Sequence, residues 1–317
     1  MTWGVAEAWN AALEERKERE PRERDNLWAS ELGSAPVDIW LKMRGEKPSN
    51  PPNSRSLRKF EAGNVFEWIV QLVLLRAGVL KEQQQWSTHQ YPNCLPVTGK
   101  ADFIAGGKPD LKQFAAAMEG MDVPEMFLRG GEAVVRHLAK KYPDGLEQVP
   151  VEVKSVSGSM FELLLKREKA NDHHRLQAAH YLVAGNYPYA VLLYICRDDL
   201  RLMEFEVGQS AVDEYKARVA ELTAILRSDT MPEKEKPVRY DPDAGSFQVN
   251  WRVTYSPFLT KVYGYKDQKE FEDEWRPKVA AWNRVLVRMR DGKEMTKSNE
   301  QYLAEMREAG FEPNDLK

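Results

Sequence analysis

The sequence has few cysteines and no long apolar run, and each absence excludes a class of protein. Only Cys94 and Cys196 occur among 317 residues, too few for a disulfide framework or for a metal site built from four thiolates. The best apolar stretch, residues 69–75, ends at Arg76, whereas a membrane helix needs about 20 apolar residues. No basic region followed by an apolar stretch begins the chain, so we expect no secretory signal and a cytoplasmic protein.

An excess of charge of one sign is also missing. The 46 Lys and Arg residues and 49 Asp and Glu residues leave a formal net charge of -3, so any contact with nucleic acid must be local. The five histidines do not fall into zinc-binding spacing, and no serine or cysteine occupies a nucleophile elbow. With 42% hydrophobic and 30% charged residues, the composition is that of a soluble globular protein with one decorated domain or two.

The spacing of apolar residues predicts an α/β fold, with a mixed central β-sheet flanked by helices. We expect helices over residues 57–77, 172–185 and 211–226, and strands over residues 85–91, 97–105, 149–156, 189–196 and 200–207. The expected parts are a charged N-terminal helix or arm (1–26), a core (27–228) with a helical insertion (106–148), and a helical C-terminal extension (229–317) docked on the core.

One predicted strand carries an acid and a lysine together. Glu152 and Lys154 alternate with Val151 and Val153, so both polar side chains emerge on the face opposite the valines. For this pattern alone, the simplest interpretation is a half-exposed strand with an ion pair on its surface.

The neighbouring strand favours a catalytic interpretation instead. Asp102 is the sole acid in a run, residues 98–104, that is otherwise fit for burial, and a buried carboxylate is costly unless a cation or a donor meets it. Glu67 lies at the edge of the apolar stripe of the first helix. Three carboxylates and a lysine suit metal-assisted phosphodiester hydrolysis, because Mg²⁺ takes oxygen ligands and a lysine can offset charge on the phosphate.

Four short motifs resemble one known family, the RecB-type branch of the PD-(D/E)XK nucleases. They are GNVFE (residues 63–67), GKAD (99–102), EVK (152–154) and QAAHY (177–181), in the family's order and in the expected helices and strands. The resemblance covers about residues 27–207 and implies a restriction-endonuclease-like core. The insertion departs from the family's short spacing between the second and third motifs.

The resemblance also implies roles for single residues. Glu67, Asp102 and Glu152 would ligate Mg²⁺ or Mn²⁺ together with the main-chain carbonyl of Val153, and Lys154 would serve the attacking water. Gln177 and Tyr181 would position the metal site or the DNA backbone. A literal Pro109-Asp110 pair competes with Asp102, but its surroundings are typical of a turn, so we favour Asp102.

Basic residues beyond these motifs are candidates for contacts with DNA phosphates. His174 and Arg58 are the two that we assign to substrate binding, and solvated helix faces are the alternative for all of them. The wider candidate rim consists of Arg55, Arg58, Lys59, Lys166, Arg167, Lys169 and Arg175.

Some relatives, among them the CRISPR adaptation nucleases and AddB-like helicase-nucleases, hold an iron-sulfur cluster with four cysteines. Here the corresponding positions are Ala35, Val253, Ser256 and Val262, so no cluster is expected. We infer that the C-terminal segment still docks against the N-terminal one, using Trp251, Tyr255, Phe258 and the valines.

The sequence therefore predicts a Mg²⁺- or Mn²⁺-dependent DNA nuclease. We expect an exonuclease that acts in recombination, repair or replication in a phage or prokaryote, with DNA as its substrate and a helicase or single-strand annealing protein as a candidate partner. The alternatives are a structure-specific or restriction-type endonuclease, and a catalytically idle DNA-binding or scaffold subunit on the same fold.

Overall fold

The computed structural model describes residues 4–15, 20–120, 125–242 and 244–312 and forms two compact units. Unit 1 comprises Met1–Arg19, Arg24–Gly33 and Asn53–Arg227, and unit 2 comprises Glu20–Glu23, Ser34–Pro52 and Ser228–Lys317. From sequence we assigned residues 34–52 to the core, whereas they cluster with the C-terminal residues. No helix of the described residues is long and apolar enough to cross a membrane.

Unit 1 is built on a six-stranded mixed sheet, which confirms the predicted fold class. Its strands are β1 (Leu27–Trp28), β2 (Leu80–His89), β3 (Val97–Gly107), β4 (Leu146–Val156), β5 (Ala190–Cys196) and β6 (Leu202–Val207). Its helices are α1 (Val5–Glu14), the 3-10 turn η1 (Ala29–Glu31), α3 (Ser54–Arg76), α4 (Leu111–Met118), α5 (Glu125–Lys141), α6 (Gly158–Arg167), α7 (Asp172–Gly185) and α8 (Ser210–Leu226).

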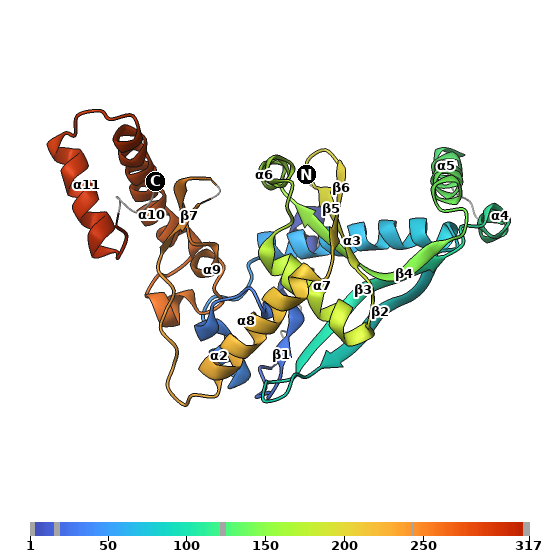
Figure 1. Cartoon of the computed structure of the whole chain (residues 1–317), viewed down its shortest axis with the longest axis horizontal. Helices are drawn as coiled ribbons and strands as arrows, with labels where there is room; N and C mark the ends of the chain where they lie inside the picture. The colour runs from blue at the N-terminus through green and yellow to red at the C-terminus, as the bar shows by residue number, and fades with distance from the viewer. Residues whose placement is uncertain (1–3, 16–19, 121–124, 243, 313–317) are drawn as a thin grey trace. The chain divides into compact units, whose positions relative to one another are not determined.

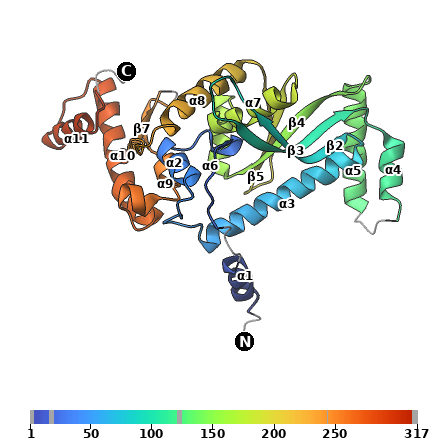
Figure 2. The ribbon, with the colours of Figure 1, turned by 90° about the horizontal axis from the view of Figure 1, so that it is seen from below.

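Helices cover both faces of this sheet. Figure 2 shows the strands between α3 on one side and α7 with α8 on the other. Val70 of α3 packs in a buried cluster with Val151 and Val153 of β4, and Tyr181 of α7 packs with Ala101 and Ile104 of β3. The two valines therefore face α3, as the alternation predicted, and Glu152 and Lys154 face the opposite way.

The sheet is open along part of β3. Strand β2 pairs antiparallel with β3 along one edge, so β1 and β4 must share the other edge. There, β1 pairs parallel with Val97 and Thr98, and the antiparallel pairing with β4 starts only at Phe103. Residues 99–102 therefore have no strand partner on this edge, and polar groups can gather in the opening.

The predicted insertion forms a small subdomain at one end of β3 and β4 (Figure 1). Helices α4 and α5 enclose a buried cluster that includes Phe114, Met118 and Val135, together with Ala77 and Val79 at the end of α3. Asp110 caps α4 by accepting a hydrogen bond from the backbone N–H of Lys112. Residues 121–124 of the insertion lie outside the described residues, as do residues 16–19 of the predicted N-terminal arm.

Unit 2 combines a two-stranded antiparallel sheet with helices. Its elements are α2 (Pro36–Met43), β7 (Val238–Asp241), β8 (Ser246–Val249), α9 (Trp251–Thr254), the π-helical turn η2 (Leu259–Tyr263), α10 (Gln268–Arg290) and α11 (Lys297–Glu308). Phe247 and Trp282 meet edge to face in its core, with ring centroids 5.2 Å apart, and the buried Met306 of α11 belongs to the same cluster.

The predicted docking of the C-terminal segment is present inside unit 2. Phe258 and Val262 pack in one cluster with Ala35, Val37 and Leu41 of the N-terminal segment. We predicted that Tyr255 takes part in this packing, but its side chain is 67% exposed and the prediction is wrong for this residue.

Candidate active site

A cavity of about 380 Å³ lies at the opening in the sheet of unit 1. Five of the predicted site residues line it: Glu67 of α3, Asp102 of β3, Glu152 of β4, and Gln177 and Tyr181 of α7. The opening explains this gathering, because a gap between β3 and β4 lets helices on opposite faces of the sheet contribute to one cavity.

Asp102 is held where β4 leaves β3. Its Oδ2 accepts a 2.9 Å hydrogen bond from the backbone N–H of Val153, two residues beyond the last paired position of β4. The side chain is buried, and this burial, followed by the negative charge of Glu152, raises the pKa of Asp102 to about 8. The two buried carboxylates therefore destabilise each other here, and the charge of Lys154 offsets only part of this effect.

Glu152 has one satisfied oxygen and one without a partner. Its Oε1 accepts hydrogen bonds from Lys154 Nζ at 2.6 Å and from Gln177 Nε2 at 2.7 Å. Its Oε2 is buried and accepts no hydrogen bond from any described residue. Since buried polar atoms are nearly always satisfied, this oxygen is a candidate ligand for a bound cation.

Lys154 contacts Glu152 directly. Burial lowers its pKa, but the charges of Glu152 and Asp102 and the hydrogen bond to Glu152 outweigh this effect, so the pKa of Lys154 is raised. The ammonium group is therefore protonated at neutral pH, and it lies beside Glu152 as the strand alternation predicted.

Gln177 and Tyr181 form a relay along one face of α7. Gln177 Nε2 donates to Glu152 Oε1 and also to the Tyr181 hydroxyl at 2.9 Å. The Tyr181 hydroxyl then donates to the backbone carbonyl of Lys100 at 2.9 Å. Burial, followed by the charge of Glu152, raises the pKa of Tyr181 well above its ordinary value, so the hydroxyl stays protonated. The relay thus fixes the Glu152 carboxylate relative to β3.

Glu67 faces the same cavity from α3. Its pKa is raised, first by burial and then by the charge of Glu152. Across the part of the chain that the structure describes, however, no group of three or more His, Cys, Asp or Glu side chains is placed to hold a metal ion together. The three predicted ligands therefore share one cavity without forming a ready-made three-carboxylate cage.

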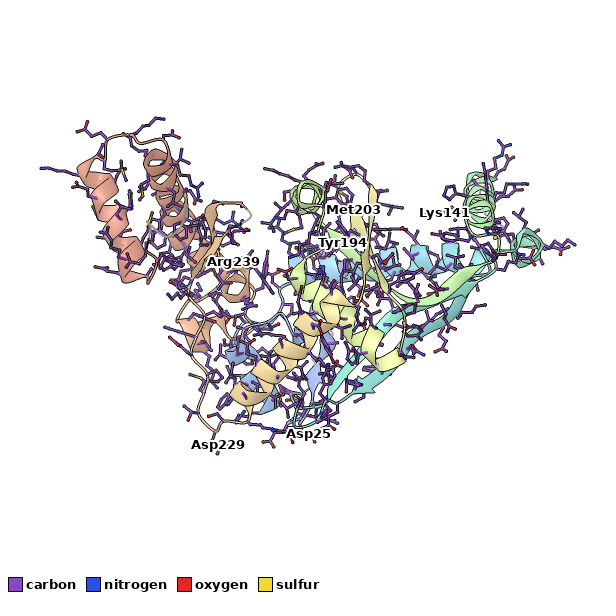
Figure 3. The ribbon with its side chains drawn as sticks, in the orientation of Figure 1. Asp25, Lys141, Tyr194, Met203, Asp229 and Arg239 are labelled. Carbon is purple, nitrogen blue, oxygen red and sulfur yellow. The ribbon has the colours of Figure 1, made fainter. Side chains whose placement is uncertain are left out.

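The two predicted substrate-binding cations have other neighbours. His174 Nδ1 shares a 2.7 Å hydrogen bond with the hydroxyl of Tyr194, which is labelled in Figure 3. Burial, then the charges of His173 and Lys154, keep the pKa of His174 well below its ordinary value, so the imidazole is neutral. Arg58 hydrogen-bonds Asn10 of α1. Neither residue lines the cavity.

Carboxylates already neutralise part of the predicted basic rim. Arg175 contacts Asp172 and Glu214, and Lys169 also pairs with Asp172. These cations are therefore less available to DNA phosphates than the sequence suggested.

The sequence interpretation missed several residues of the cavity wall, notably Trp28, Trp86, Lys100 and Gln84. Trp86 and Lys100 are cross-strand partners in the β2–β3 pair. The predicted strands over residues 85–91 and 97–105 include both residues, but their register could not be read from the sequence. Their pairing, which places an exposed tryptophan opposite a lysine, therefore emerges only from the structure.

Comparisons with known proteins give only distant likenesses. No protein-family model and no curated protein sequence matches the chain. A crystal structure of SSO0001 is 15% identical, covers 71% of this chain and 87% of its own, and has a TM-score of 0.43. LHK-Exo in complex with dAMP is 11% identical, covers 69% of this chain and 92% of its own, and has a TM-score of 0.38. Another structure of LHK-Exo, an alkaline exonuclease from Laribacter hongkongensis, is 10% identical, covers 69% of this chain and 92% of its own, and has a TM-score of 0.33.

Proposed function

We propose that this protein is a metal-dependent nuclease that hydrolyses phosphodiester bonds in DNA. The observation that carries the proposal is the pair of buried carboxylates, Asp102 and Glu152, which line one cavity beside a protonated Lys154. Glu152 Oε2, which accepts no hydrogen bond from the described residues, and the raised pKa of Asp102 both fit a site that takes up a divalent cation.

Asp102 and Glu152 would hold the cation directly, and the carbonyl of Val153 would be a further oxygen ligand. Glu67 would act from the cavity wall through the water molecules that Mg²⁺ retains. When bound, Mg²⁺ or Mn²⁺ supplies polarisation of the phosphate and a lowered pKa of a coordinated water.

The chain's own groups would orient the reaction. Lys154 is held by Glu152 and would offset the negative charge that develops on the phosphate, or orient the attacking water. Gln177 and Tyr181 would keep the Glu152 carboxylate in place during turnover, because they link it to the backbone of β3.

The four motifs support a RecB-like nuclease, and on that resemblance we propose exonuclease action in recombination, repair or replication. A helicase or a single-strand annealing protein is a candidate partner in such a role. The opposed apolar and polar faces of β4 support this interpretation over an idle scaffold, since a scaffold gains nothing from two adjacent buried acids.

Digestion of end-labelled DNA with Mg²⁺ or Mn²⁺ tests the proposal, using linear single strand, linear duplex and closed circle as substrates. We expect the wild type to degrade linear DNA, Asp102→Ala and Lys154→Ala to be inactive, and Lys278→Ala to retain full activity. Lys278 is a suitable control because it pairs with Glu274 on α10, outside the cavity. Cleavage of the closed circle would identify an endonuclease. Intact DNA that is nevertheless retained in a binding assay would identify an idle binding module.

A further inference from the structure

Two tryptophans form part of the wall of the carboxylate cavity. Trp28 of β1 and Trp86 of β2 meet edge to face, with ring centroids 5.5 Å apart and an interplanar angle of 62°. Trp86 is 59% exposed. A large aromatic side chain exposed in a cavity, and braced by a second ring, is typical of a binding surface rather than of a core.

Each ring of this pair has a cation beside it. Lys100 Nζ lies 5.7 Å from the ring centroid of Trp86, and the Arg24 guanidinium lies 5.9 Å from that of Trp28. Arg24 is fixed by Glu31 and by the carbonyl of Asn26. The ammonium of Lys100, by contrast, makes no hydrogen bond or ion pair with any described residue. This cation is therefore available to a ligand phosphate.

The aromatic pair is connected rigidly to the carboxylates. Lys100 is two residues from Asp102 in β3, and its carbonyl accepts the hydrogen bond of Tyr181. Gln84, two residues from Trp86 in β2, lies across from Asp102 and has a left-handed backbone with φ of 51°. Two residues of a strand span roughly 7 Å, so the indole lies beside the place where a phosphate would react.

Resting on the nuclease function proposed above, we propose that Trp86, braced by Trp28, is a stacking platform for an unpaired base next to the scissile phosphate, with Lys100 on the adjoining phosphate. The substrate class is then single-stranded DNA or an unpaired strand end. Bases inside a duplex are covered on both faces by their neighbours, whereas an unpaired base can offer a face to an indole.

The charge of the protein favours this mode of binding. With a formal net charge of -3, the molecule as a whole does not attract a polyanion strongly. Stacking does not depend on charge, so it can hold a strand where general phosphate attraction is weak. Trp86 would supply the affinity that tolerates salt, and Lys100 would supply a salt-dependent part.

The test measures DNA binding in EDTA, where cleavage cannot occur, by fluorescence anisotropy of a labelled single-stranded oligonucleotide. We expect Trp86→Ala to weaken binding roughly 5- to 150-fold, which corresponds to the usual 1–3 kcal/mol for one stacked base. Trp86→Phe should recover most of the affinity. Trp9→Ala is the matched control, because Trp9 is 53% exposed on α1 and lies outside the cavity.

Salt dependence and abasic oligonucleotides give the sharper readouts. The loss caused by Trp86→Ala should be the same at low and high salt, whereas Lys100→Ala should reduce the salt slope by about one. An abasic site at one position should weaken wild-type binding and cause no further loss in Trp86→Ala. A melting temperature equal to that of the wild type checks that each variant is folded.

Three results would overturn the platform: wild-type protein that does not bind single strands, Trp86→Ala binding equal to wild type, or an equal loss on blunt duplex. Because binding is measured without metal, these results are independent of the digestion assay. If the wild type digests DNA but Trp86→Ala binds single strands as tightly as the wild type, only the stacking platform is contradicted. If binding depends on Trp86 but no DNA is digested, only the nuclease proposal is contradicted.

Discussion

The backbone N–H of Val153 donates its hydrogen bond to the side chain of Asp102 rather than to a neighbouring strand at this edge. The bond lies just beyond Phe103 and Val151, the last paired residues of β3 and β4. A carboxylate thus continues the strand ladder at the point where the sheet opens. Asp102 is consequently both a structural acceptor and a candidate metal ligand, and these two roles can be separated by substitution.

Asp102→Asn should abolish nuclease activity but stabilise the metal-free protein at pH 8. The pKa of Asp102 is raised from 3.8 to about 8 in the folded state, so the folded state binds more protons than the unfolded state between these values. The contribution of Asp102 to the free energy of unfolding is therefore fully present below about pH 4 and is lost as the pH rises through 8. Asparagine keeps an acceptor for Val153 without the charge, so we expect a gain of up to about 5 kcal/mol in urea unfolding at pH 8.

The effect of added Mg²⁺ on the melting temperature should differ between the wild type and Asp102→Asn. The wild type should be stabilised in proportion to its metal affinity, because the cation binds the folded state only, and Asp102→Asn should respond weakly or not at all. Equal shifts in melting temperature for both proteins would contradict the assignment of Asp102 as a ligand.

Gln177→Ala should lower activity or metal affinity about 10- to 100-fold, as is usual when a group that orients a metal ligand is removed. Gln177 holds Glu152 Oε1 and Tyr181 at the same time. Tyr181→Phe removes the links to Gln177 and to the carbonyl of Lys100 but leaves Gln177 bonded to Glu152, so it should have the smaller effect. Steady-state kinetics across a Mg²⁺ titration measures both. A larger loss for Tyr181→Phe would show that the relay does not act through Glu152.

His180 should make the protein less stable as the pH falls from about 6.5 to 4. Its side chain is fully buried, with ring nitrogens bonded to Tyr215 at 3.0 Å and Ser87 at 3.2 Å, and burial lowers its pKa to about 4. Between pH 4 and 6.5 the unfolded state binds more protons than the folded state. The contribution of His180 to the free energy of unfolding is therefore fully present above pH 6.5 and is lost as the pH falls to about 4.

The contribution of His180 to this loss should reach at most about 3 kcal/mol at pH 4. Denaturant unfolding of the wild type and of His180→Gln across this pH range isolates it, because glutamine keeps polar partners but does not titrate. Parallel stability profiles for the two proteins would show that His180 is not the group responsible.

Ser256→Ala should destabilise unit 2 by about 1–3 kcal/mol. Ser256 Oγ donates to the buried Asp38 at 2.7 Å and accepts from the backbone N–H of Phe258 at 3.1 Å. Removing the hydroxyl takes a donor from a buried carboxylate. Thermal unfolding measures the effect, and Ser298→Ala, an exposed change on α11, is the control that should leave the melting temperature unchanged.

The long regular elements were predictable because their signals are local. Helix α7 (Asp172–Gly185) begins and ends where the sequence predicted, since Asn186 adopts the left-handed backbone that ends a helix, with φ of 53°. The strand alternation likewise placed Glu152 and Lys154 together. Strand β1 and helix α2 were not predicted, because both depend on partners that are distant in the sequence. Strand β1 has only two residues and forms by pairing with β3, and the short helix α2 is covered by Phe258.

The glycines of the motifs show the same limit. A side chain at Gly99 would meet His180 at 2.6 Å and Ala29 at 2.9 Å, so this glycine permits a close approach. A side chain at Gly63 would meet only Ser155, at an ordinary 3.8 Å. The sequence alone does not distinguish these two glycines, because the packing of α7 against β3 depends on the tertiary structure.

The insertion has a consequence for how this molecule can be altered. Its two ends, Gly107 and Leu146, are already register partners in the β3–β4 pair, so a tight turn could join them directly. Such a shortened chain would leave the cavity wall complete, since none of the described residues between these ends lines it. It would, however, uncover Ala77 and Val79 at the end of α3. Helices α4 and α5 therefore offer a site for labels or surface tethers, provided that these two buried residues stay covered.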